Sequence, residues 1–260
     1  MYICDVIQIN ETHMKRKILL ILFCLIACVV NAQTAAEKKL PWDYPVKPNM
    51  KKWEQLQTVK ERIDICQIQE NLLSSLSTDD LTDVCMQYPL LGVVLAWSPH
   101  DRGLDSLFRE FNGVRELYKR KDAYKHLLNW YDSTMQNLPF LNKDVPLVEK
   151  GSFCSKISIA ELLLSRCQLP DDANKDNNYR EIIRHLVSGY EKTFAYPEYF
   201  TAYSFSISCF ARAKIINKID EQYIVKMPVD DKNTLFTRRH LDDLTRSAID
   251  ELSYQFIQEK

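Results

Sequence analysis

Glycine is scarce in this chain. Its 260 residues include only five glycines, and no two lie close enough together to form a loop that cradles a phosphate group. Glycine also supplies many of the tight turns of β-sandwiches and β-barrels. This scarcity favours a helical fold and argues against nucleotide binding through a glycine-rich loop.

An excess of positive charge is also lacking. The 34 Lys and Arg residues nearly balance the 35 Asp and Glu residues, so the formal net charge is -1. Proteins that bind nucleic acids or anionic membranes usually concentrate positive charge. We therefore expect no nucleic-acid partner.

Familiar motifs for catalysis and metal binding are missing. The chain has no CxxC, HExxH or GxSxG motif, so we expect no metal site and no cofactor. His100, Asp101 and Arg102 form the most site-like cluster, because they fall in a predicted turn and loops can present polar groups to a cleft. They are the candidate catalytic residues, although ordinary turn chemistry explains them equally well.

A short apolar run near the N-terminus predicts export. Residues 14–33 read MKRKILLILFCLIACVVNAQ, in which a basic stretch precedes thirteen apolar residues. This run is too short to span a bilayer comfortably. The small residues Val30 and Ala32 predict cleavage by a signal peptidase before Gln33, and we expect translation to start at Met14.

Two alternatives to a signal peptide over residues 1–32 stay open. The first is a retained N-terminal membrane helix, which the short apolar run disfavours. The second is a lipid anchor on Cys28, because residues 25–28 (LIAC) have the form of a bacterial lipobox. The apolar run continues past Cys28 to a good cleavage site, so we favour free export to the periplasm or the cell exterior. The mature chain is then expected to have no transmembrane span.

The remaining chain divides into an arm and a helical domain. Residues 33–49 contain three prolines and predict an extended arm. Residues 50–260 predict one all-α domain, an irregular multi-helix bundle or a short array of helix pairs. A subdivision is possible near the proline-containing segment 138–155. Residues 89–97 are almost wholly apolar, which predicts that they lie in the centre of the core.

Helical patterns are clearest in three places. Thr58 and Glu61 fit a capping box at the start of a helix. One apolar stripe predicted to face the core consists of Tyr179, Ile182, Ile183, Leu186, Val187, Tyr190 and Phe194. A second, in the predicted last helix over residues 236–260, consists of Leu241, Leu244, Ala248, Leu252 and Phe256.

Five cysteines follow the predicted cleavage site, namely Cys66, Cys85, Cys154, Cys167 and Cys209. In an oxidising compartment, Cys66 is placed to pair with Cys85, and Cys154 with Cys167. Their positions on apolar helical stripes instead favour buried free thiols.

An aromatic-rich segment surrounds Pro197. Tyr196, Tyr199 and Tyr203 are the candidate binding residues, because exposed rings stack on sugars or grip a partner helix. Their spacing also fits a packing seam between two antiparallel helices, which we favour.

Short motifs between Tyr44 and Tyr131 carry a family resemblance. They are Tyr44-Pro45-Val46, Trp53, Cys66-Gln67-Ile68, Leu76-Ser77-Thr78, Cys85, Tyr88-Pro89, Phe111-Asn112-Gly113 and Arg120-Lys121-Asp122. This stretch resembles a family of small exported helical proteins from gut-dwelling bacteria that has no established function. Family members often carry proline where this chain has Gln69. The resemblance implies export and a helical fold, and it identifies no catalytic or binding residue.

These observations favour a non-enzymatic exported protein that binds another protein of the bacterial cell envelope. One alternative is an enzyme whose site is assembled from distant residues, which a deep polar cleft would favour. The other is a carbohydrate-binding module, which needs at least two coplanar exposed aromatic rings. A broad apolar surface patch would favour protein binding.

Overall fold

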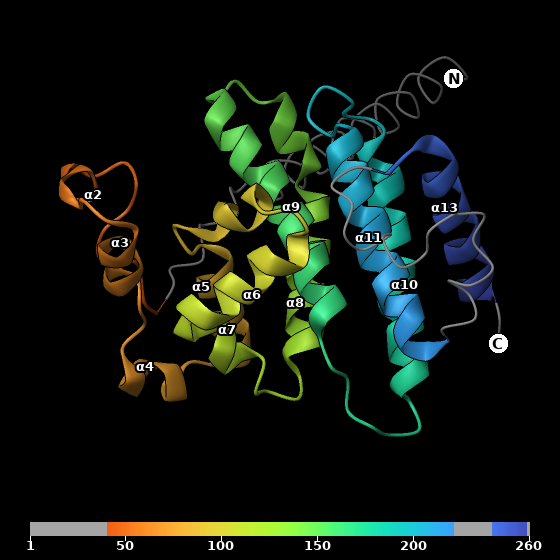
Figure 1. Ribbon diagram of the computed structural model, residues 1–260, viewed down its shortest axis with the longest axis horizontal. Helices are drawn as coiled ribbons and strands as arrows, with labels where there is room; N and C mark the ends of the chain where they lie inside the picture. Colours follow the sequence, from red (N-terminus) through yellow and green to blue (C-terminus); the bar gives the residue numbers. More distant parts are fainter. Residues whose placement is uncertain (1–40, 221–240, 259–260) are drawn as a thin grey trace, which may run out of the picture. The chain divides into compact units, whose positions relative to one another are not determined.

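The computed structural model describes residues 41–220 and 241–258, which belong to one compact unit (Figure 1). All regular secondary structure in these residues is helical, which confirms the predicted all-α class. The predicted signal peptide, the lipobox cysteine Cys28 and residues 33–40 of the predicted arm lie outside the described residues. Within the described part of the chain, no helix combines the length and hydrophobicity needed to cross a membrane.

Short helices make up the N-terminal half. They are α2 (Lys51–Gln55), α3 (Val59–Ile65), α4 (Glu70–Ser75), α5 (Thr78–Met86), the 3-10 helix η1 (Leu91–Ala96), α6 (His100–Glu110) and α7 (Asn112–Leu117). Longer helices follow. They are α8 (Ala123–Gln136), the 3-10 helix η2 (Leu138–Asn142), α9 (Leu147–Arg166), α10 (Lys175–Thr193), α11 (Ala202–Ile219) and α13 (Asp243–Gln258).

Local side-chain chemistry explains where several helices begin. Thr58 Oγ1 accepts a hydrogen bond from the Glu61 backbone N–H at 3.1 Å, and Glu61 accepts one from the Thr58 N–H at 3.1 Å. The predicted capping box is confirmed. Ser77 Oγ similarly accepts from the Asp80 N–H at 3.1 Å and caps α5.

The segment before α2 is held by aromatic packing. Residues 41–49 contain no helix or strand, yet Tyr44 and Val46 are buried. The Tyr44 hydroxyl donates to the Val84 carbonyl at 2.8 Å, and its ring packs beside Tyr88 and Phe111. These contacts fasten the segment to α5 and to the start of α7.

Helix α9 lies at the centre of the core. It packs against η1, α8 and α11, and its residues from Ile157 to Ser165 are all buried. It begins at Leu147, so the connection after α8 is shorter than the predicted segment 138–155. Gly151 does not interrupt the helix, because it lies exposed and one glycine costs a helix only about 1 kcal/mol.

Two residues of the predicted core stripes are exposed. Phe194 is 54% exposed and lies just past the last residue of α10. Leu244 is 65% exposed, because Thr245 and Ile249 set the buried face of α13. The other stripe residues are buried, in agreement with the prediction.

Candidate functional site

The three candidate catalytic residues lie in the first turn of α6. His100 begins α6 and is buried against the rings of Tyr203 and Phe210. Asp101 forms ion pairs with basic residues of α9 and α11, and Arg102 is exposed. Successive helical residues point about 100° apart. The predicted turn is the first turn of a helix, and the three side chains therefore face different surroundings.

The candidate binding tyrosines are only partly exposed and contact neighbouring elements. The Tyr203 hydroxyl donates to the Leu95 carbonyl at 2.7 Å. Lys150 Nζ donates to the Tyr199 hydroxyl at 3.2 Å and lies 5.3 Å from the centre of its ring. No ring contact joins Tyr196 to the other two in the described structure. The three tyrosines therefore do not assemble into one platform.

The most exposed ring of this segment belongs to Phe194. It packs edge-on against Tyr190 and Phe205, with interplanar angles of 69° and 65°. Flat sugar rings are bound by coplanar exposed aromatic rings, and these pairs are not coplanar. This arrangement favours the packing seam.

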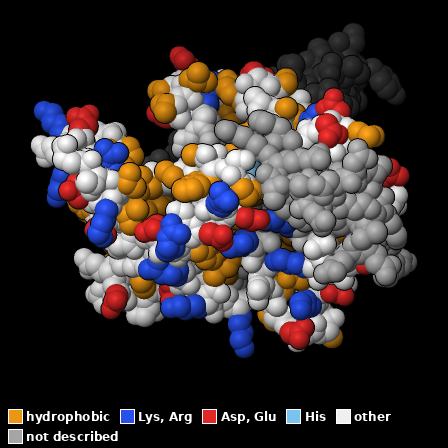
Figure 2. All heavy atoms as spheres, viewed as in Figure 1, with side chains coloured by type: hydrophobic (Ala, Val, Ile, Leu, Met, Phe, Trp, Pro, Cys, Tyr) orange, Lys and Arg blue, Asp and Glu red, His pale blue; other side chains and the backbone are white. Residues whose placement is uncertain are grey.

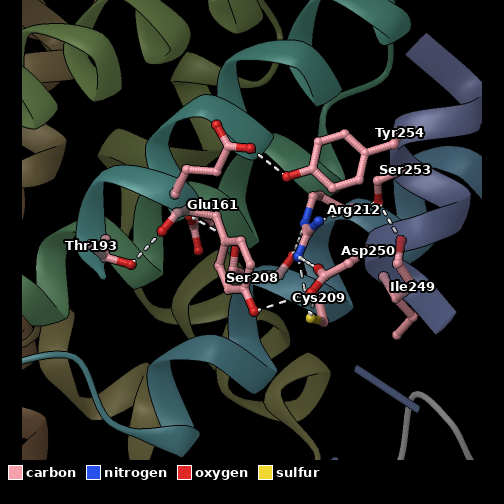
Figure 3. A network of polar contacts seen from close by, with 11 residues as sticks. Glu161, Thr193, Ser208, Cys209, Arg212, Ile249, Asp250, Ser253 and Tyr254 are labelled. Atoms are coloured by element: carbon pink, nitrogen blue, oxygen red, sulfur yellow. Dashed lines mark hydrogen bonds and ion pairs between the residues drawn. The ribbon is translucent and has the colours of Figure 1, made fainter. Parts of the chain in front are cut away.

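A buried polar network joins α10, α11 and α13. Arg212 of α11 is fully buried and points toward α13 (Figure 3). Its Nη2 lies 2.6 Å from Asp250 Oδ1, and its Nη1 donates to Ser253 Oγ at 3.3 Å. Its guanidinium also lies 4.5 Å from the centre of the Tyr190 ring. The charge is thus paired and stacked, which makes its burial tolerable.

A second buried ionisable residue, Glu161, lies on α9 beside this network. Its Oε1 accepts hydrogen bonds from the Tyr131 hydroxyl at 3.0 Å and from Ser208 Oγ at 3.2 Å. Burial raises the pKa of Glu161 to about 7, against the opposing effects of these hydrogen bonds and of Arg212. The adjoining cavity of about 10 Å³ holds at most one water molecule, so the network is part of the core.

The sequence carries a signal for both charged core residues. Glu161 is the one charged residue between Ile157 and Ser165, and Arg212 is the one charged residue between Ala202 and Ala213. A charge inside such a segment indicates a buried pair, but its partner comes from a distant helix that no spacing rule identifies.

The five cysteines described by the structure are all buried free thiols, as their core positions suggested. Burial raises the pKa of Cys66 and Cys154 to about 11, and that of Cys167 and Cys209 to about 12. A thiol is nucleophilic only when ionised. None of these cysteines has the environment of a catalytic nucleophile.

An apolar groove lies between α3, η1 and α6. Its volume is about 150 Å³. The residues that line it are Val59, Ile63, Tyr88, Leu90, Val93, Val94, Trp97, Gly103, Ser106, Leu107 and Glu110. Three of the large hydrophobic side chains are exposed: Val59 by 66%, Val93 by 50% and Trp97 by 41%. We call this feature the apolar groove.

The exposure of η1 corrects the prediction that residues 89–97 lie in the centre of the core. A 3-10 helix has three residues per turn, so Leu91 and Val94 share the buried face. Val93 lies a third of a turn away from that buried face, and Trp97 lies just beyond the helix. One face of this apolar segment is therefore buried, and the other lies at the protein surface.

Gly103 brings the floor of the apolar groove together. A Cβ atom at this position would lie only 2.2 Å from the Val94 carbonyl oxygen. Glycine is thus required for the close approach of α6 to η1. In the space-filling view, hydrophobic side chains gather over α3 and η1, with charged side chains around them (Figure 2).

Comparison with protein-family models, with curated proteins and with solved structures found no match to this chain. Among residues 41–220 and 241–258, no group of three His, Cys, Asp or Glu side chains is arranged to hold a metal ion. The apolar groove is therefore the candidate functional site on geometric grounds alone.

Proposed function

We propose that this chain is an exported, non-enzymatic helical protein that binds another protein of the bacterial cell envelope through the apolar groove. The observation that carries the proposal is the exposure of Val59, Val93 and Trp97 around one groove. Contiguous exposed apolar surface on a folded chain marks an interaction site.

The groove has the size and composition of a site for a protein side chain. An apolar cavity of about 150 Å³ accommodates a molecule as large as benzene. The groove therefore has room for one aromatic or branched aliphatic side chain of a partner. Trp97 at its edge is the residue type that most often dominates binding energy at protein interfaces.

The lining of the groove favours binding over catalysis. Glu110 is the only acidic or basic residue that lines it, and its carboxylate accepts a hydrogen bond from Arg109 at 2.7 Å. An enzyme site needs a nucleophile or an acid–base group close to its substrate. Export is inferred separately, from the basic and apolar pattern of residues 14–33.

Paired valine substitutions test this proposal. Val59→Asp places a charge in the groove, at the first residue of α3, where the helix dipole tolerates an acid. Val148→Asp is the matched control, because Val148 is 76% exposed and lies in the first turn of α9. Each variant and the wild-type chain would be cross-linked in the native cell envelope, and the recovered proteins quantified.

The expected result is one protein that is recovered in near-stoichiometric amount with the wild-type chain and with Val148→Asp. We expect its recovery to fall at least tenfold with Val59→Asp, as for loss of a hot-spot contact worth about 1.4 kcal/mol or more. Equal recovery with Val59→Asp and Val148→Asp would contradict the proposal. Circular dichroism of both variants checks that they remain folded.

A further inference from the structure

A second cavity, opposite in chemistry to the apolar groove, lies between α8 and α10. Its volume is about 300 Å³. Helix α9 runs antiparallel to both α8 and α10, so α8 and α10 run in the same direction (Figure 1). The residues that line the cavity are Tyr131, Asp132, Met135, Gln136, His185, Ser188, Gly189 and Lys192. We call it the polar cleft.

A fixed histidine lies at one end of the polar cleft. His185 Nδ1 of α10 lies 2.8 Å and 3.0 Å from the two carboxylate oxygens of Asp132, on α8. Both side chains are about one-third exposed. A carboxylate that holds Nδ1 orients the ring and leaves Nε2 as the nitrogen that can bind a ligand.

Three further polar side chains line the cleft without partners. Within the described residues, the side chains of Gln136, Ser188 and Lys192 form no hydrogen bond or ion pair with one another or with other groups. Ser188 and Lys192 follow His185 by three and seven residues, so all three lie on one face of α10. They form a row about 10 Å long, at about 1.5 Å of rise per residue.

A glycine shapes the floor of the cleft. A Cβ atom at Gly189 would lie 2.0 Å from the Tyr131 hydroxyl oxygen. The Tyr131 ring reaches past this glycine to hydrogen-bond the buried Glu161. The floor is therefore anchored in the core, and a side chain at position 189 would clash with it.

We propose that the polar cleft binds a small organic acid. Lys192 and Ser188 bind its carboxylate at one end, and His185 binds a hydrogen-bonding group at the other. Lysine and hydroxyl groups are good donors to a carboxylate, and a charge-assisted bond is the stronger kind. The volume of about 300 Å³ matches the smallest ligand pockets of proteins. Both carboxylate oxygens of Asp132 lie within 3.0 Å of His185 Nδ1, and Lys192 supplies the positive charge that attracts the acid.

The test is calorimetric titration of the purified chain with acetate, succinate, citrate, glutamate and inorganic phosphate. We expect at least one of the carboxylic acids to bind with a Kd below about 1 mM. Lys192→Met should weaken that binding at least about tenfold, as for loss of a charge-assisted hydrogen bond. His185→Gln should weaken it as well, and Ser188→Phe, which fills the cleft from its exposed side, should abolish it.

Lys121→Met is the control, because it removes an exposed lysine that does not line the cleft. It should leave the affinity unchanged. The proposal is overturned if none of the four acids binds below that limit, or if the Lys192 and His185 variants bind as tightly as the wild-type chain. Phosphate binding as tight as that of the best acid would overturn the assignment to carboxylic acids.

Discussion

The apolar groove exposes hydrophobic side chains at the surface, whereas the buried polar network holds charged side chains in the core. In the groove, valine and tryptophan side chains lie at the surface, where their exposure adds nothing to the stability of the isolated chain. In the network, a guanidinium and a carboxylate lie in the core, where each depends on its partners. Substitutions in the network should therefore change folding stability, and substitutions on the exposed rim of the groove should change binding alone.

The largest expected effect is that of Asp250→Ala. This change leaves the fully buried Arg212 without its carboxylate, which should lower the free energy of unfolding by about 3–5 kcal/mol. Urea denaturation measures this change. Asp243→Ala on the same helix is the control, because the Asp243 side chain is 91% exposed and its pairing with Arg246 lies at the surface. Similar midpoints for the two variants would show that Arg212 does not depend on Asp250.

The second largest expected effect is a change of folding stability with pH that arises from Glu161. Burial raises its pKa from 4.5 to about 7, so the folded chain binds the proton more tightly than the unfolded chain. The stability associated with the protonated form is fully present below about pH 4.5 and is lost as pH rises through about 7. The loss amounts to about 3 kcal/mol.

Glu161→Gln removes this titration while keeping the size of the side chain. Denaturation of both proteins at several pH values between 4 and 8 measures the difference in slope. We expect the wild-type chain to lose stability relative to Glu161→Gln across this interval. Parallel pH profiles would mean that Glu161 titrates in the folded chain as it does in the unfolded chain.

Gly103→Ala should change both folding stability and the shape of the apolar groove, because Gly103 is buried and also lines the groove. The new Cβ would meet the Val94 carbonyl oxygen, and overpacking of this kind costs about 1–3 kcal/mol. Gly151→Ala is the matched control, because no atom beyond its chain neighbours and its own helix backbone lies within 4 Å of its Cβ position in α9. It should stabilise the chain by about 0.5–1 kcal/mol. Equal denaturation midpoints for the two variants would contradict the close approach of α6 to η1.

The smallest effect on stability is expected for Val93→Asp. Val93 is half exposed in the isolated chain, so the free energy of unfolding should change by no more than about 0.5 kcal/mol. Partner recovery should nevertheless fall as it does for Val59→Asp. Strong destabilisation by Val93→Asp would show that this side chain belongs to the core and would weaken the proposed function.

Local patterns in the sequence predict much of the fold but little of the site. The Thr58–Glu61 capping box and the stripe from Tyr179 to Tyr190 depend on residues that are close in the sequence, and the structure agrees with them. The apolar groove depends on three separate elements and on the 3-10 geometry of η1. That geometry turns Val93 outward from a segment whose composition alone predicts burial.

Adjacency along the chain does not bring side chains together. His100, Asp101 and Arg102 are neighbours in the sequence, but their helix points them in different directions. The Arg212–Asp250 pair joins residues 38 positions apart, and the polar cleft joins α8 to α10. Tertiary packing brings these groups together, and no spacing along the chain indicates it.

Footprinting of Trp97 tests the proposed groove most directly. Hydroxyl-radical labelling would be compared between the purified chain and the chain in its native cell envelope. Tyr254, on α13, is the internal reference, because it is 38% exposed and Trp97 is 41% exposed. We predict that Trp97 is protected in the envelope while labelling of Tyr254 is unchanged. Equal labelling of Trp97 in both preparations would contradict the proposal that a partner protein covers the apolar groove.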